Sequence, residues 1–554
     1  MPQIIRLAGM KYFLTQKLSW NQINKFPHNT FVWEGIDGSR VITHFPPADN
    51  YCSHANAADV LKSESNFKDK ERSSEALLVY GHGDGGGGPN PKMLEMLSRL
   101  EASAFGGTPS VQFGSPVDFF ERIEKNIDQY CVWSGELYFE YHRGTYTTQA
   151  KNKLWNRRAE ELMREIEMMS FFSHMLRASE SYDRESIEKW WKLILLNQFH
   201  DVIPGTSIHC VYEDSTAHYD YIFQEGSQKR ETVANSLASL YKSENSATNR
   251  MIVVNPLSFE RTEIVNVAGL ELDSEHSLMV QENENTKLGV VKTDACGFAI
   301  IDGSSICNVE QAVSIKKSGG SFVLQNKWIS AEIDSSGHLV SLVWLANGRE
   351  IVQTRSKGNH LVMFDDHPLF WDAWDVDAYH LEKRIEFHMT TDTAPKILEE
   401  GPIRVAIQFE IPISEQSSIT QTIRLTSESS ALEFDTTVEW HESHKFLKVE
   451  FPFDIRSQQC TYEIPYGWVQ RPTHFNTSWD LARFEVCAHR WADLSEYNFG
   501  VALLNDCKYG YSTRGSLMSL SLLRSPKAPD ETADMGVQNF RYAIYPHEKS
   551  FQVS

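Results

Sequence analysis

The 554-residue sequence lacks the marks of a membrane-bound, secreted or nucleic-acid-binding protein. No apolar run approaches the ~20 residues that a membrane-spanning helix needs. The first residues, MPQIIRLAGMKYFLTQ, show no basic start, apolar stretch or cleavage site of a secretory signal. Lys and Arg total 53 against 74 for Asp and Glu, and the net charge of −21 is spread along the chain. These features exclude a helical membrane protein and argue against a nucleic acid or an anionic membrane as a partner.

Paired cysteines are also missing. The eight cysteines are dispersed along the chain without any C-x-x-C spacing. This usage fits neither a disulfide scaffold nor a thiolate zinc site. We therefore expect a reducing compartment and a cytoplasmic protein, for which homo-oligomerisation stays open.

What is present is a long chain whose hydrophobic period changes twice, which indicates several domains. In the first zone, residues 1–125, the stretch FVWEGIDGSRVITHF predicts a hairpin that turns at Asp37-Gly38. Two short apolar runs, ALLVYG (76–81) and VQFG (111–114), are each followed by a helical pattern. The order of strand and helix predicts α/β material, the C-terminal part of an α/β domain.

The second zone, residues 126–245, has a helical period. One apolar stripe contains Trp155, Ala159, Leu162, Ile166, Met169 and Leu176. A second helix, SIEKWWKLILLNQFH, and a third that begins near Thr206 are separated by Val202-Ile203-Pro204-Gly205. Because Pro and Gly end helices, we predict a three-helix bundle.

The third zone, residues 250–554, follows the polar linker SENSATNR and is rich in strands. Apolar residues alternate strictly from Leu432 to Trp440 and from Ile329 to Ile333, with a turn at Asn347-Gly348. We predict β-sandwich domains, incomplete at the C-terminus. The fold class is thus α/β plus all-β, with a helical bundle between the two parts.

A glycine run, YGHGDGGGGP, is the most conspicuous local signal. Gly81-x-Gly83-x-x-Gly86 formally matches a dinucleotide fingerprint. However, Asp84 would face the pyrophosphate, and the prolines that follow remove backbone donors. Alternatively, the glycines bring the backbone close to a polar ligand and present Asp84 to it. A purely structural explanation is also open, in which the glycine run is a flexible turn and Asp84 is solvated.

A second signal is His200-Asp201, at the end of the helical stretch LLNQFHD. A histidine at a helix C-terminus interacts favourably with the dipole, and an adjacent Asp is a common cap, so structure alone explains the pair. The functional alternative is a neutral imidazole that binds a metal, with Asp201 beside it or on a ligand hydroxyl.

Three further stretches are weaker candidates. His441 and His444 end an alternating strand and would point to opposite faces, so we do not expect them to bind a metal together. GELYFEYHRGTYTTQ, which contains Tyr146, suits either a sugar or a plain domain junction. FDDHPLFWDAWD, which contains Trp374, mixes acids with indoles as sugar sites do, or forms a surface loop with a packed Trp pair.

Taken together, LLNQFHDVIPGTS, YGHGDGGGGP, GELYFEYHRGTYTTQ, FDDHPLFWDAWD and QRPTHFNTSWDLARFEV resemble the retaining class II α-mannosidases of glycoside hydrolase family 38, and most of all their cytosolic branch. The resemblance covers practically the whole chain. It implies an α/β catalytic domain, a three-helix bundle and β-sandwich domains. It also implies a mannose-containing oligosaccharide as substrate and one divalent metal ion, zinc or cobalt.

The resemblance also implies roles for individual residues. Asp84 matches the general acid/base, His200 the metal-binding histidine supplied by the bundle, and Asp201 a sugar-contacting acid. Tyr146 and Trp374 are further candidates for contact with the sugar. The family's His-x-Asp metal motif and its nucleophile segment have no counterpart in this sequence. We therefore expect the chain alone to lack turnover.

Two alternatives remain on the sequence. The first is a non-catalytic carbohydrate-binding or scaffold protein, which applies if this short form is the mature product. The second is a nucleotide-dependent oxidoreductase built on Gly81 to Gly86, which we do not favour.

Overall fold

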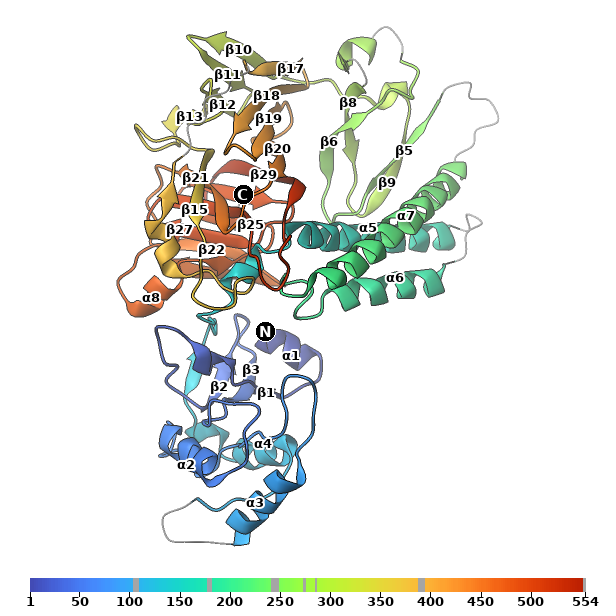
Figure 1. Ribbon diagram of the computed structural model, residues 1–554. Coiled ribbons are helices and arrows are strands. Elements are labelled where there is room, and N and C mark those ends of the chain that lie inside the picture. Colours follow the sequence, from blue (N-terminus) through green and yellow to red (C-terminus); the bar gives the residue numbers. More distant parts are fainter. Residues whose placement is uncertain are drawn as a thin grey trace. The chain divides into compact units, whose positions relative to one another are not determined.

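The computed structural model describes residues 1–102, 109–176, 182–240, 249–272, 276–283, 286–386 and 394–551 (Figure 1). The chain divides into two compact units. The first combines Met1–His142 with the distant segment Phe475–Arg483, and the second contains Arg143–His474 and Phe484–Ser554. Most of the expected linker SENSATNR lies outside the described residues. No helix in the described parts of the chain is long and apolar enough to cross a membrane.

A four-stranded sheet forms the centre of the first unit. Its order is β1 (Tyr12–Leu14), β3 (Arg40–His44), β2 (Thr30–Glu34) and β4 (Val132–Ser134). The antiparallel hairpin of β2 and β3 turns at Asp37-Gly38 as predicted, and Gly38 has a φ of 81°. Apolar side chains cover both faces: Phe31 and Trp33 pack on one, and Val32 packs against α4 on the other.

Helices and a distant segment complete this unit. The helices are α1 (Pro2–Leu7), α2 (Ala57–Asn66), α3 (Pro91–Ala102), α4 (Pro116–Glu124) and α8 (Ser478–Ala482). Short 3-10 turns lie at η1 (Lys17–Trp20) and η2 (Ile127–Gln129). Helix α8 belongs here because its Trp479 ring lies 6.2 Å from that of Trp133.

The prediction of strands at residues 76–81 and 111–114 is wrong. The run ALLVYG forms a single bridge, Ser53 to Tyr80, and VQFG has no regular structure. An apolar run becomes a strand only when a neighbouring backbone supplies a ladder of hydrogen bonds. The helices predicted after both runs do form, as α3 and α4.

The predicted three-helix bundle is confirmed. It consists of α5 (Ala150–Met175), α6 (Arg184–Asn197) and α7 (His209–Ser239). The core contains Ala159, Leu162, Met163, Ile166, Ile187, Trp190, Ile194, Tyr219 and Ile222. Leu176 does not belong to the stripe, because it lies beyond the helix and is 47% exposed. Helix α7 begins at His209, three residues after Thr206, and follows Ile208, whose backbone is extended.

Strands form the remainder of the second unit. Two small sheets contain β5 (Met251–Asn255) with β9 (Gly297–Ile301), and β6 (Arg261–Asn266) with β8 (Thr286–Thr293) and β7 (Gln281–Asn283). A five-stranded meander contains β10 (Ser314–Ser318), β11 (Ser321–Gln325), β12 (Ile329–Ile333), β13 (Leu339–Trp344) and β14 (Arg349–Glu350). The predicted turn at Asn347-Gly348 joins β13 to β14, and a second turn around Gly337 joins β12 to β13.

Two larger sheets pack face to face as the predicted sandwich. The six-stranded sheet has the order β16 (Arg384–Ile385), β15 (His360–Asp365), β21 (Lys445–Pro452), β28 (Leu517–Arg524), β27 (Gly510–Arg514) and β24 (Val486–Cys487). The nine-stranded sheet has the order β17 (Lys396–Glu400), β18 (Arg404–Pro412), β19 (Ser418–Thr426), β20 (Leu432–Trp440), β29 (Gly536–Glu548), β26 (Phe499–Asn505), β25 (Trp491–Ser495), β22 (Gln459–Ile464) and β23 (Gly467–Pro472).

The contact between these sheets is aromatic. The rings of Phe434 on β20 and Phe451 on β21 lie 5.8 Å apart, and Tyr462 on β22 donates a hydrogen bond to Thr513 on β27. Strand β20 alternates buried and half-exposed residues as its sequence predicts. The fold class, α/β followed by a helical bundle and all-β sheets, is therefore confirmed.

Candidate active site

Asp84 lies on an exposed glycine loop in the first unit. The backbones of His82 and Gly87 bond to each other across this loop, and Gly85 and Gly86 have φ values of 96° and 68°. A Cβ atom on Gly83 would lie 2.3 Å from the ring of Tyr51. Glycine is therefore required beside Asp84 both for the turn and for the approach of Tyr51.

Tyr51 orients Asp84. The Tyr51 hydroxyl donates a hydrogen bond of 2.9 Å to Oδ2 of Asp84. This bond, together with burial, raises the pKa of Tyr51 to about 12, so the phenol keeps its proton throughout the neutral range. The loop is thus more than a solvated turn, because its carboxylate has a fixed neighbour that acts only as a donor.

The same geometry weakens the dinucleotide alternative. That fingerprint needs a strand before the glycines and a helix that begins directly after them. Here residues 76–79 form no strand, and α3 begins only at Pro91.

His200 and Asp201 lie in the second unit, in the loop between α6 and α7. Nε2 of His200 lies 3.2 Å from Oδ2 of Asp201, and the side chain of His200 is 76% exposed. Asp201 is held in place by Thr206, whose hydroxyl donates to Oδ1 at 2.8 Å. The structure therefore brings the histidine and the acid together and leaves the imidazole accessible.

Lys153 on α5 anchors the loop that carries this pair. The Lys153 ammonium donates to the carbonyl oxygens of Thr148 and Ile203, and burial lowers the pKa of this lysine. Gly205 has a φ of 91°, and a Cβ there would lie 2.5 Å from the Thr148 carbonyl oxygen. The loop is thereby fastened to the segment that contains Tyr146.

Arg524, which the sequence did not single out, connects the remaining motifs. Its guanidinium is fully buried and donates to Oδ2 of Asp366 at 2.6 and 2.9 Å. It also donates to Thr148 and to the carbonyl oxygens of Ala373, Asp372 and Asp375. The sheet order explains this meeting, because β15, β21 and β28 are neighbours and Arg524 ends β28.

Tyr146 and Trp374 are brought into the same neighbourhood. The Thr145 amide donates to the Trp374 carbonyl at 3.2 Å, and the Arg143 amide donates to Oδ1 of Asp375 at 3.1 Å. Burial raises the pKa of Asp375 to about 6, although the Arg143 guanidinium opposes this shift. The Trp371 ring, 61% exposed, lies 5.7 Å from that of Trp374.

The residues present do not by themselves form a metal site. In the part of the chain that the structure describes, no group of three or more His, Cys, Asp or Glu side chains is arranged to hold an ion. Zinc needs three or four protein ligands, whereas His200 has Asp201 beside it. His441 and His444 lie in the loop after β20 rather than on the strand, and they contact different carboxylates, Glu439 and Asp372.

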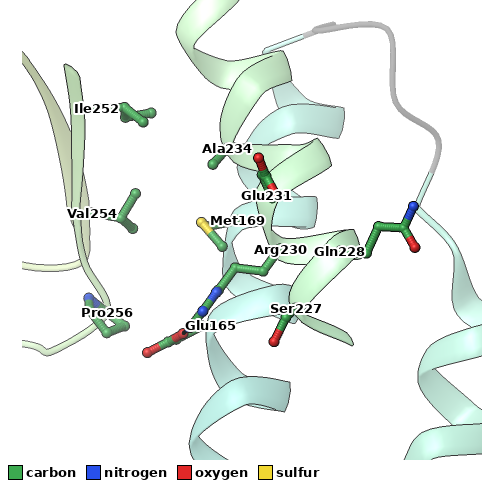
Figure 2. Close-up of a pocket in the computed structure, with 10 residues that line it drawn as sticks. All are labelled: Glu165, Met169, Ser227, Gln228, Arg230, Glu231, Ala234, Ile252, Val254 and Pro256. Carbon is green, nitrogen blue, oxygen red and sulfur yellow. Dashed lines mark hydrogen bonds and ion pairs between the residues drawn. The ribbon is translucent and has the colours of Figure 1, made fainter. Parts of the chain in front are cut away.

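A cavity of about 610 Å³ lies elsewhere, between α5, α7 and β5. Figure 2 shows Ile252 and Val254 of β5 facing Met169 and Ala234 of the helices. The lining contains none of the expected site residues and no histidine or cysteine. We therefore do not assign the chemistry to it.

Sequence reasoning missed Tyr51 and Arg524. Tyr51 lies 33 positions before its partner Asp84, and Arg524 lies 158 positions after Asp366. Neither residue belongs to a motif that can be recognised in the sequence. The contacts that give each its role could therefore be found only in the structure.

Comparison with known proteins places these motifs in one family. Residues 1–136 match the glycosyl hydrolases family 38 N-terminal domain, residues 140–237 the alpha mannosidase middle domain, and residues 324–532 the family 38 C-terminal domain. The crystal structure of an alpha-mannosidase from Enterococcus faecalis V583 superposes with a TM-score of 0.76 at 15% identity. It covers 99% of this chain and 73% of its own, and at this identity it shows the fold alone.

Curated relatives are closer in sequence. Alpha-mannosidase 2C1 of Homo sapiens is 44% identical over 100% of this chain and 52% of its own length. Alpha-mannosidase G of Dictyostelium discoideum is 40% identical over 100% of this chain and 54% of its own. The chain therefore spans about half the length of the curated relatives it matches.

Proposed function

The chain belongs to glycoside hydrolase family 38, and we propose that its Asp84 is the general acid/base of a retaining α-mannosidase acting on mannose-containing oligosaccharides. The observation that carries this assignment is the contact of Tyr51 with Asp84 on the glycine loop. A carboxyl group in this role must be exposed to substrate and yet held in one orientation. Asp84 meets both conditions, since it is exposed and its Oδ2 is bound.

The proposed reaction is a double displacement. A carboxylate nucleophile attacks the anomeric carbon while Asp84 gives its proton to the leaving oxygen. Asp84 then takes a proton from water, which attacks the glycosyl-enzyme bond and releases mannose. During both steps the Tyr51 hydroxyl stays on the other carboxyl oxygen. Asp201, Tyr146 and Trp374 are our candidates for contact with the sugar.

The 554-residue sequence contains no match to the family's nucleophile segment. We therefore propose that this polypeptide by itself binds sugar but does not turn it over. His200 is our candidate ligand for zinc or cobalt. The described residues do not complete the coordination of such an ion, and none of the proposed steps uses one.

We also propose the division into residues 1–125, 126–245 and 250–554, and a cytoplasmic location. All eight cysteines, which lie in the described residues, are free, as expected in a reducing compartment. The net charge of −21 disfavours nucleic acid as a partner.

The test compares the 554-residue chain with an extended protein, which also contains the part of Alpha-mannosidase 2C1 that this chain does not cover. The extended protein should hydrolyse 4-nitrophenyl α-mannoside but not 4-nitrophenyl β-mannoside. The 554-residue chain alone should hydrolyse neither. Release by the chain alone would contradict the proposal about the nucleophile. Saturable binding of mannobiose by both proteins, without turnover by either, would favour a non-catalytic carbohydrate-binding protein.

A further inference from the structure

An aromatic ledge, formed by Trp20 and Tyr51, lies beside Asp84 in the first unit. The two ring centroids are 6.3 Å apart, and Tyr51 in turn donates to Asp84. Trp20 is the last residue of the short 3-10 turn η1, and its side chain is 38% exposed. An indole left in solvent beside a carboxylate is the arrangement that stacks on the apolar face of a sugar ring.

The neighbours of Trp20 fix the orientation of its ring. The Lys17 ammonium lies 3.8 Å from the Trp20 ring centroid and 4.8 Å from that of Tyr51. The His142 ring approaches edge-on at 6.3 Å. The ammonium lies over one face of the indole, and the two contacts together restrict how the ring can turn.

A buried carboxylate holds the loop that follows Trp20. Glu140 is 1% exposed and accepts hydrogen bonds from the amides of Ile23 and Asn24 at 2.7 and 2.9 Å. Its second oxygen accepts from the Asn24 side chain at 2.6 Å. This anchoring makes the ledge a preorganised surface rather than a mobile side chain on a loop.

We propose that Trp20 stacks on the sugar unit that carries the leaving oxygen, and so determines the preference of the enzyme for oligosaccharides. The Tyr51 ring contacts the indole, and its hydroxyl binds the carboxylate, so Tyr51 links the two groups. Trp20 is therefore displaced from the bond that breaks by the width of one ring, and contacts the neighbouring unit rather than the mannose being released. This inference rests on the role proposed for Asp84.

Two substrates separate this contact from a general effect of mutation. Mannobiose has a second sugar that Trp20 can contact, whereas α-mannosyl fluoride has only a fluorine atom in that place. In the active, extended protein, Trp20→Ala should raise the KM for mannobiose about two- to tenfold with little change in kcat. The value of kcat/KM for α-mannosyl fluoride should stay unchanged, and Trp20→Phe should recover most of the lost affinity.

Trp468 provides a matched control, because it is also 38% exposed but lies on β23, where its ring packs 5.2 Å from that of Phe551. Trp468→Ala should affect neither substrate. An unchanged KM for mannobiose in Trp20→Ala would overturn the inference, and so would an equal loss with both substrates. Failure of the unmutated protein to hydrolyse either substrate would instead refute the proposed function.

Discussion

Replacing Arg524 by Met should loosen two loops that are far apart in the sequence. Both members of the ion pair with Asp366 are buried, with side-chain exposures of 0% and 1%. Burial already raises the pKa of Asp366, and Arg524 is the charge that opposes this shift. Removal of one partner from a buried pair leaves an uncompensated carboxylate and costs about 3–5 kcal/mol.

The same substitution removes the donors to Thr148, Ala373, Asp372 and Asp375. Hydrogen exchange followed by mass spectrometry should therefore show faster exchange in residues 143–149 and 366–376 together. Arg524→Met combined with Asp366→Asn should recover part of the loss, because no charge remains buried. Arg99→Met is the control, since the pair of Arg99 with Glu95 is exposed and contributes less than about 1 kcal/mol.

Unchanged exchange in both segments would refute the idea that Arg524 holds them together. Faster exchange in residues 366–376 alone would show that the contact with Thr148 has no role in fixing the preceding turn.

Two further predictions concern the same region. The folded state holds a proton on Asp375 between pH 4 and 6 that the unfolded chain releases, because burial raises the pKa of Asp375 to about 6. This one group should therefore remove about 2 kcal/mol of stability as pH rises from 4 to 7. Asp375→Asn should lack that loss in urea unfolding at pH 4 and 7, and parallel curves would contradict the assignment. Gly144→Ala places a Cβ 2.1 Å from Nη1 of Arg524 and should cost about 1–3 kcal/mol. In the control Gly114→Ala, no atom lies within 4 Å of the new Cβ, so the urea midpoint should stay unchanged. Equal midpoints for the two variants would show that the contact of Gly144 with Arg524 is not tight.

Local sequence patterns predicted the elements whose partners are near in sequence. The hairpin at Asp37-Gly38 and the alternation along β20 both follow from short-range periodicity and turn chemistry. The bundle was also predictable, because its apolar stripe runs along single helices.

Features that depend on distant partners could not be predicted from local patterns. The run at residues 76–81 is as apolar as a buried strand, yet it forms a single bridge because pairing is decided elsewhere in the chain. Helix α8 belongs to the first unit although it lies more than 300 residues away from the rest of that unit. At the site, Asp84 was found through its motif, whereas Tyr51 and Arg524 have no motif and are defined by contacts.

The most direct test of the account is the dependence of Asp84→Asn on the leaving group. An amide cannot donate the proton that an alcohol needs in order to leave, so hydrolysis of mannobiose by the extended protein should fall about 10²–10⁴-fold. Fluoride leaves without a proton, and formation of the glycosyl-enzyme from α-mannosyl fluoride, measured as the pre-steady-state burst of fluoride, should stay close to the wild-type rate. Equal losses with both substrates, or no loss with mannobiose, would contradict the assignment of Asp84 as the general acid.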